Sequence, residues 1–294
     1  MTLPATFTPA FLRQLELLKL RARRAFLGTK QGGHISPRKG HGIEFSDYRK
    51  YEPGDNPRHI DWGVYGRTDR LYVKRYQEEQ DLSMLLVIDA SASMSAFESD
   101  KKWERARDIA IALSYTALME QDNVVLCVPD KLLSAMYSGP KAIHLIAKEL
   151  MAIVAQGRPD FVKEMQRAAA RVRFPGKAIV ISDLLYPYDQ IEKAFDILRA
   201  KNLEISAIHL LGPNDLNPLP DSSFATVVDS ETNETLEISL DPENRAEYQE
   251  ILEEHNENIR TYFARSEISY TLAKSSDDLL SFITNNLNQI GLIR

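Results

Sequence analysis

The sequence predicts an α/β protein with a mostly parallel central sheet and helices on both faces. Three mostly apolar runs, at residues 82–88, 177–182 and 203–211, have the composition of strands that are buried on both faces. From residue 94 onward, segments with the spacing of amphipathic helices alternate with these runs. Strands separated by helices form parallel sheets, so the alternation predicts helices packed on both sides of the sheet.

The helical segments are recognised by their apolar stripes. Residues 100–119, for example, place Trp103, Ile109 and Leu113 on one face at helical spacing. Further helices are expected at residues 141–155, 161–173, 189–200, 242–265 and 277–290, and a loop at 212–220. Asn123–Val128 and Lys131–Tyr137 are expected to pair as a hairpin at the sheet edge, with shorter strands at 224–228, 235–239 and 268–271.

The first 80 residues differ in character from residues 81–294, which predicts two domains with these bounds. Residues 9–27 are expected to form a helix, and six basic residues against one acid lie between residues 11 and 30. Such a helix either docks its apolar stripe on its own domain or lies on anionic lipid or RNA.

The segment from Gly32 to Trp62 mixes turn formers, aromatics and paired charges without a clean period, so we expect an irregular extension. Its order must come from ion pairs and ring packing, because it contains little apolar content. The segment is either a structural collar or a partner surface. A strand is expected after it, at residues 71–77.

Bulk composition narrows the functional classes. The 294 residues, 44% of them hydrophobic, suffice for one core of roughly 200 residues plus an extension. A net charge of -6 argues against general nucleic-acid binding. The single cysteine, Cys127, excludes an internal disulfide, and neither a membrane span nor a signal-peptide pattern is found. We therefore expect a soluble, cytoplasmic protein without a transmembrane segment.

A candidate cation site follows the first core strand. Asp89-x-Ser91-x-Ser93 places one carboxylate and two hydroxyls in the turn that leaves this strand. In open α/β sheets, ligands bind at the carboxyl ends of the strands, and oxygen ligands suit a small divalent cation such as Mg²⁺. The alternative is that Asp89 and the serines only cap the next helix.

A longer pattern then identifies a family resemblance. It comprises Glu44-Phe-x-Asp47-Tyr-Arg49-x-Tyr51, Pro53-Gly54-Asp55, Arg58, Asp61-Trp62, Val73-Lys74 and Asp89-Ala-Ser-x-Ser-Met. This pattern resembles the bacterial domain-of-unknown-function family 58, the MoxR-associated proteins with a von Willebrand factor A-like domain. The resemblance is close over residues 32–94, and the α/β pattern extends it to the C-terminus.

The resemblance implies a von Willebrand factor A fold with a metal-ion-dependent adhesion site that holds Mg²⁺ or Mn²⁺. Asp89, Ser91 and Ser93 match the first loop of that site, and Asp183 matches its later acid. The family's threonine is missing, because the second loop reads Gly157-Arg158-Pro159-Asp160. Proline offers no side-chain oxygen, so Asp160 or water would have to substitute, and the site is either weak or a relic.

The function implied by the resemblance is that of a non-enzymatic adaptor or co-chaperone. Its partner would be a MoxR-type AAA+ ATPase or a client of that ATPase, bound through a carboxylate at the metal. The alternatives are a Mg²⁺-dependent hydrolase and a membrane- or RNA-associated protein that uses its basic helix. The hydrolase is disfavoured because the second residue after Asp89 is Ser91 and not an acid.

Overall fold

A computed structural model describes residues 3–20, 44–77, 83–172, 176–218, 224–228, 235–239 and 241–294. The chain forms two compact units, one of Met1–Arg23 with Leu82–Arg294 and the other of Arg24–Asp81. The second boundary lies next to the division expected after residue 80. The N-terminal helical segment, however, groups with the larger unit and not with the signature segment that follows it.

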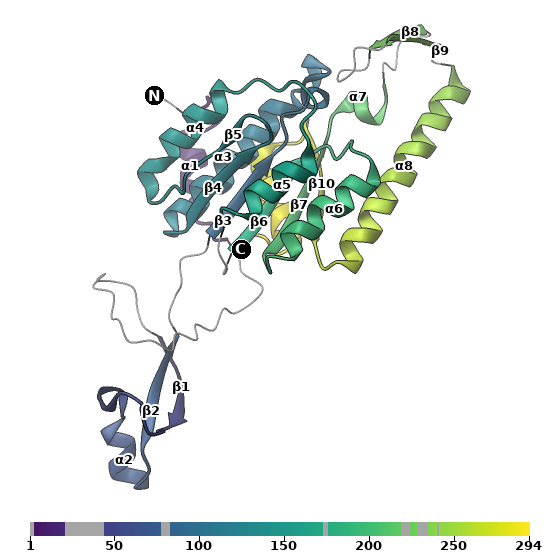
Figure 1. Cartoon of the computed structure of the whole chain (residues 1–294). Helices are drawn as coiled ribbons and strands as arrows, with labels where there is room; N and C mark the ends of the chain where they lie inside the picture. Colours follow the sequence, from purple (N-terminus) through teal and green to yellow (C-terminus); the bar gives the residue numbers. More distant parts are fainter. Residues whose placement is uncertain are drawn as a thin grey trace. The chain divides into compact units, whose positions relative to one another are not determined.

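The larger unit is built on a six-stranded sheet (Figure 1). Its strands, in spatial order, are β10 (Ser269–Lys274), β7 (Glu204–Leu211), β6 (Gly176–Ser182), β3 (Ser83–Ile88), β4 (Asn123–Val128) and β5 (Leu132–Leu133). All neighbours are parallel except β4 and β5, which form the antiparallel edge. The expected mostly parallel sheet and edge hairpin are therefore confirmed, but the second strand of the hairpin is Leu132–Leu133 and not the longer Lys131–Tyr137.

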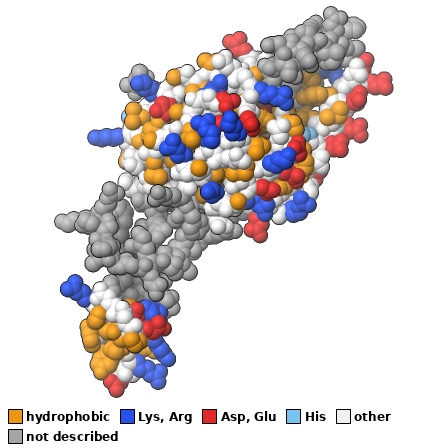
Figure 2. Space-filling model, in the orientation of Figure 1, with side chains coloured by type: hydrophobic (Ala, Val, Ile, Leu, Met, Phe, Trp, Pro, Cys, Tyr) orange, Lys and Arg blue, Asp and Glu red, His pale blue; other side chains and the backbone are white. Residues whose placement is uncertain are grey.

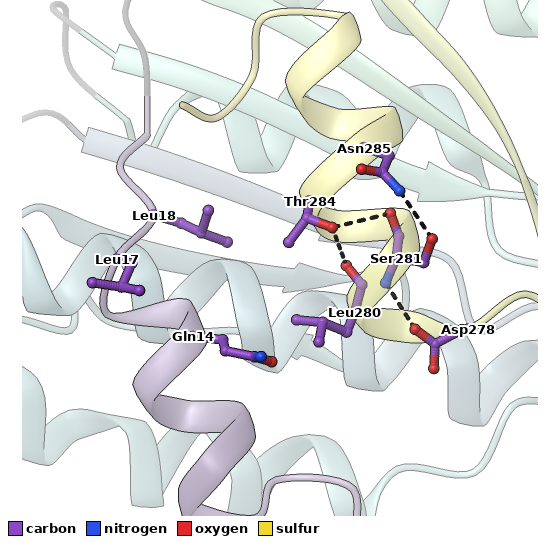
Figure 3. Close-up of a pocket in the computed structure, with 8 residues that line it drawn as sticks. All are labelled: Gln14, Leu17, Leu18, Asp278, Leu280, Ser281, Thr284 and Asn285. Carbon is purple, nitrogen blue, oxygen red and sulfur yellow. Dashed lines mark hydrogen bonds between the residues drawn. The ribbon is translucent and has the colours of Figure 1, made fainter.

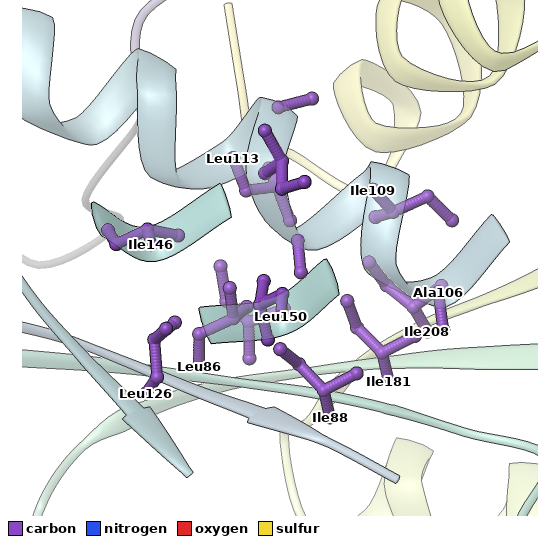
Figure 4. Packing of buried hydrophobic residues seen from close by; sticks show 14 of the residues in the cluster. Leu86, Ile88, Ala106, Ile109, Leu113, Leu126, Ile146, Leu150, Ile181 and Ile208 are labelled. Carbon is purple, nitrogen blue, oxygen red and sulfur yellow. The ribbon is translucent and has the colours of Figure 1, made fainter. Parts of the chain in front are cut away.

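Alternate side chains of the central strand β3 pack into two separate hydrophobic cores, one on each face of the sheet. Leu86 and Ile88 belong to one apolar cluster, whereas Leu85 and Val87 belong to the other. The first cluster is covered by α1 (Pro9–Leu15), α3 (Lys102–Met119), α4 (Ile143–Ala152) and the C-terminal turns α9 (Leu279–Ser281), η5 (Phe282–Asn286) and α10 (Leu287–Gln289). The second is covered by α5 (Phe161–Ala169), α6 (Tyr188–Arg199) and α8 (Pro242–Arg265). Figure 4 shows the first cluster, with side chains of α3 and α4 above the sheet.

Several elements differ from expectation. Helix α1 ends at Leu15 and not at residue 27, and Leu20 forms an isolated bridge with Ile293 instead. The stretch 212–220, expected as a loop, contains the short helix α7 (Pro213–Leu216). The last helix is interrupted by the π-turn η5, which separates α9 from α10. The antiparallel pair β8 (Phe224–Val228) and β9 (Thr235–Ser239) lies where short strands were expected.

The smaller unit has more regular structure than its sequence predicts. β1 (Glu44–Lys50) pairs antiparallel with β2 (Tyr72–Gln77), and a turn η1 (Pro57–His59) leads to α2 (Trp62–Thr68). Asp61 caps α2 by accepting the backbone N–H of Gly63 at 2.9 Å. Arg49 pairs with Asp55 at 2.6 Å, so ion pairs do order this segment as expected.

Helix α2 buries none of its residues, and the side chain of Trp62 is 62% exposed. Figure 2 shows hydrophobic side chains grouped on one side of this unit. The expected role of this segment, as a structural collar or as a partner surface, stays a prediction.

The packing of α1 on the larger unit yields the first prediction. Leu15 is fully buried in the first core cluster, so Leu15→Ala is expected to lower the free energy of unfolding by about 2–5 kcal/mol. Leu17 is 81% exposed, and Leu17→Ala is the matched control with an expected change within about 0.5 kcal/mol. Urea unfolding followed by circular dichroism measures both. Equal stabilities of the two variants would mean that α1 does not dock on this core.

Candidate functional site

The neighbouring strands β3, β6 and β7 end at one edge of the sheet. The predicted acids Asp89 and Asp183 directly follow the first two of these strands. In the parallel register of β3 and β6, Ile88 pairs with Ile181, and the backbone N–H of Asp89 donates to the carbonyl of Ile181 at 2.8 Å. Asp89 and Asp183 therefore follow adjacent strand ends. Strand β7 ends beside β6 and leads into α7. Both acids therefore lie at the carboxyl edge of the sheet.

Asp89 is a fully buried carboxylate that is held by hydrogen bonds. Its Oδ1 accepts the backbone N–H of Ser91 at 2.9 Å and the hydroxyl of Tyr186 at 3.2 Å, and its Oδ2 accepts the hydroxyl of Ser182 at 2.6 Å. Among the residues the structure describes, no basic side chain forms an ion pair with it. Burial, and then the negative charge of Asp183, raise the pKa of Asp89 to about 6.

The two serines bring their oxygens together beside this carboxylate. Ser91 Oγ and Ser93 Oγ lie 3.0 Å apart, with Ser91 buried and Ser93 half-buried. Ser91 precedes the turn η2 (Ala92–Ser95), but its hydroxyl makes no capping hydrogen bond there. The hydroxyls are thus not used as caps, which favours the ligand interpretation over the cap interpretation.

The second loop, Gly157–Asp160, lies against the loop Asp89–Ser93, which we call the serine loop. The backbone N–H of Ala92 donates to the carbonyl of Gly157 at 2.8 Å, and Gln156 donates to Ala90 at 2.9 Å. Pro159 is buried, whereas Asp160 is exposed and caps α5 by accepting the backbone N–H of Lys163 at 3.0 Å. Asp160 therefore has a structural role, and its role as a ligand stays a prediction.

Asp183 has a partner that sequence reasoning missed. Lys102 Nζ lies 2.9 Å from Asp183 Oδ2 and 2.8 Å from Asp215 Oδ2, and the Lys102 and Asp183 side chains are each only 1% exposed. Burial lowers the pKa of Lys102, but the two carboxylates outweigh it and the net pKa is raised, so the ammonium stays charged.

One signal for Lys102 was present in the sequence. It lies four residues before Ala106 and seven before Ile109, on the apolar stripe of α3. A lysine on such a stripe is buried with the core, and burial requires an acidic partner. Which acids supply it could not be read from the sequence, because Asp215 lies 113 residues away.

The loop after β6 is held in place by two histidines. His209 Nε2 lies 2.8 Å from the carbonyl oxygen of Asp183, and His255 Nε2 lies 2.9 Å from that of Leu184. Because a carbonyl only accepts, Nε2 of His209 carries the proton. Burial lowers the pKa of His209 to about 4, so this ring is neutral at pH 7. His209 is itself fully buried within β7.

The donor set fits a hard divalent cation in its chemistry. Asp89, Ser91 and Ser93 offer only oxygen, which Mg²⁺ and Mn²⁺ prefer. Within the described ranges, no three histidine, cysteine, aspartate or glutamate side chains are grouped so that they could hold a metal ion. A cation here would therefore depend on the serine hydroxyls and on water. Asp183 could contribute only in competition with Lys102.

A separate groove lies between α1 and the C-terminal turns (Figure 3). It has a volume of about 460 Å³ and contains none of the predicted site residues. Its lining residues are Gln14, Leu17, Leu18, Asp278, Leu280, Ser281, Thr284 and Asn285. The mixture of leucines and short polar side chains is that of an ordinary surface depression.

Fold and site together define an α/β protein with a mostly parallel sheet and a buried polar cluster at its carboxyl edge. The chain belongs to the family described as "Protein of unknown function DUF58", which matches residues 47–258. Uncharacterized proteins of Mycobacterium bovis and Mycobacterium tuberculosis are each 27% identical over 290 residues, covering 94% of this chain and 86% of the relative.

Two solved structures show weaker similarity. The conserved hypothetical protein BatB from Bacteroides thetaiotaomicron is 13% identical, with a TM-score of 0.44 over 71% of this chain and 98% of its own. The pilus adhesin SpaC from Lactobacillus rhamnosus GG, in its open conformation, is 12% identical, with a TM-score of 0.46 over 74% of this chain and 31% of its own. No helix in the described part of the chain combines the length and the apolar character needed to cross a membrane.

The raised pKa of Asp89 predicts a stability cost. The folded protein binds this proton more tightly than the unfolded chain, so the contribution of Asp89 to the free energy of unfolding falls as pH rises from about 4 through about 6 and then stays level. At pH 7.5 without divalent ions, Asp89→Asn is expected to raise the free energy of unfolding by about 2 kcal/mol, and the gain should vanish near pH 4. Urea unfolding at both pH values measures it. A destabilised Asp89→Asn at pH 7.5 would show that the charge is compensated in the fold.

Proposed function

We propose that this chain is a non-enzymatic interaction module with a von Willebrand factor A-like domain, acting as an adaptor or co-chaperone of a MoxR-type AAA+ ATPase. In this proposal, Asp89, Ser91 and Ser93 hold Mg²⁺ or Mn²⁺. One of the coordination positions that these residues leave to water would bind a carboxylate of the ATPase or of its client. The identity of the partner rests on the resemblance of the signature segment to MoxR-associated proteins, and the mode of binding rests on the site.

One observation carries the binding mode. Asp89 is buried without a basic partner among the described residues, and two serine oxygens converge beside it. Burying an unpaired carboxylate is unfavourable, so such a group is retained where a cation can neutralise it. A divalent ion held by one carboxylate and two hydroxyls keeps positive charge, which attracts a further carboxylate.

The surroundings of the site favour a protein partner over a small substrate. Val154 is 66% exposed and lies two residues before Gln156, which contacts the serine loop, and Leu185 is 42% exposed two residues after Asp183. Apolar side chains around a polar centre are typical of protein interfaces, where they exclude water from the central contact. A rim of this kind gives a carboxylate–metal contact its specificity.

The same geometry supports binding and not hydrolysis. Hydrolysis at a metal needs a group that accepts the proton of the attacking water. Both oxygens of Asp89 accept hydrogen bonds from fixed donors, and Asp183 is paired with Lys102. These two carboxylates are therefore engaged in holding structure or charge.

Metal-dependent partner binding tests the proposal. Titration calorimetry of the chelator-treated protein with Mn²⁺ is expected to show one site, with affinity lowered at least about tenfold in Asp89→Asn and in Ser93→Ala. Capture of a purified MoxR-type AAA+ ATPase should need the ion and should be lost in the same variants. Ser99→Ala, which removes an exposed hydroxyl outside the serine loop, is the matched control. Ion-independent capture that survives Asp89→Asn would overturn the proposal.

The second loop offers a separate prediction. Pro159 occupies the position where the family carries a threonine, and the loop contacts the serine loop through Gly157. Pro159→Thr is expected to tighten Mg²⁺ binding several-fold, because the hydroxyl replaces a water ligand. Pro159→Val is the control, since valine has a similar shape without the oxygen. If both variants change affinity equally, the side chain at 159 does not face the ion.

A further inference from the structure

Lys102 is a buried lysine that the proposed binding mode does not use. Its side chain is 1% exposed, and its ammonium lies between Asp183 and Asp215 at 2.9 and 2.8 Å. Lysine is almost never fully buried unless it is paired. Here it is paired twice, and each of the three residues comes from a different element: α3, the end of β6 and α7.

On each side of the Lys102–Asp183 contact, a neighbouring residue has a left-handed backbone conformation. Lys101, which precedes Lys102, has φ of 50°, and Leu184, which follows Asp183, has φ of 51°. Residues other than glycine avoid this left-handed region, so the surrounding structure must enforce it. Hydrogen bonds from the Leu184 backbone N–H to Ser182 Oγ at 2.9 Å and from His255 to the Leu184 carbonyl do so on one side. The pair is therefore held and not a chance surface contact.

We infer that Lys102 is a resident cation that sets how strongly this site binds a divalent ion. The inference rests on the proposed cation site and identifies the residue that regulates it. Asp183 is the acid expected to complete that site, but its Oδ2 accepts the ammonium of Lys102. Ammonium and divalent ion compete for one carboxylate, and their like charges repel. The wild-type ion is held by Asp89 and the serines without full use of Asp183.

The charges around the site support this assignment. Asp89, Asp183 and Asp215 are all buried, and Lys102 supplies the positive charge that pairs with two of them. Removing the ammonium leaves the carboxylate of Asp183 without its cation. A divalent ion held by Asp89 and the two serines then gains Asp183 as a second carboxylate, and the strength of oxygen-ligated cation sites rises with the number of carboxylates that face them.

The test compares Mn²⁺ affinities by calorimetry and Mn²⁺-induced shifts in thermal midpoint. Lys102→Met is expected to bind Mn²⁺ at least about tenfold more tightly than wild type and to show the larger shift. The double variant Lys102→Met with Asp215→Asn removes one positive and one negative charge together. It replaces the single variant in the affinity measurement if Lys102→Met alone fails to fold. The double variant should show the same gain in affinity.

The matched control is Lys177→Met. Lys177 is also a buried lysine, 2% exposed and paired with Glu204 at 3.2 Å, but it lies at the amino end of β6, opposite the site. Its variant should lose stability without any change in Mn²⁺ affinity. Adding Asp89→Asn to Lys102→Met should abolish the gain, which places the bound ion at the serine loop.

The outcomes separate this inference from the proposed function. If wild type binds Mn²⁺ and neither Lys102 variant binds more tightly, the role of Lys102 is overturned and the proposed site stands. If only the Lys102 variants bind, the role of Lys102 is supported and metal-dependent partner binding by the wild type is overturned. If no variant binds, both are overturned.

Discussion

The parallel pairing of β3 with β6 determines what happens at the carboxyl edge of the sheet. Because Ile88 lies opposite Ile181, the residues that leave the two strands are neighbours, and Ser182 can donate to Asp89 across the strand gap. A shift of this strand pairing by one residue would turn every side chain of β3 to the other face of the sheet. The residues that now pack in one core would then face the other. The register that buries the apolar side chains is thus the register that brings the acids together.

Burying these acids is unfavourable, and the structure compensates each one differently. Asp89 receives three hydrogen bonds but no cation within the described residues, whereas Asp183 and Asp215 share the ammonium of Lys102. Hydrogen bonds alone do not fully offset the loss of hydration, which is why the pKa of Asp89 is raised to about 6. A protein under selection for stability alone would place an uncharged residue there, which supports the proposed role of Asp89 in binding a cation.

The sequence predicted the sheet well because buried parallel strands leave a local signature. The apolar runs that became β3, β6 and β7, and the acids that follow two of them, could be read from neighbouring residues. The contact of Lys102 with Asp215 could not, because it joins a helix start to a segment expected to be a loop. In the smaller unit, β1 was missed because its two aromatic residues, Phe45 and Tyr48, lie three residues apart and give no period-two alternation. The helix expected to reach residue 27 ends at Leu15, where the backbone turns to pair Leu20 with Ile293.

The Lys102 contact also ties the site to parts of the fold beyond the sheet. Asp215 accepts the backbone N–H of Gly212 at 2.7 Å, and its carbonyl accepts the hydroxyl of Tyr248 on α8 at 2.7 Å. His255 lies about two turns after Tyr248 on the same helix. Its Nε2 forms a hydrogen bond with the carbonyl of Leu184, next to Asp183. A change in the partner of Asp183 therefore acts on the loops after β6 and β7, and both loops are bonded to one helix. Because most of the first half of α8 is exposed, these two hydrogen bonds connect the loops at the site to a helix that faces solvent.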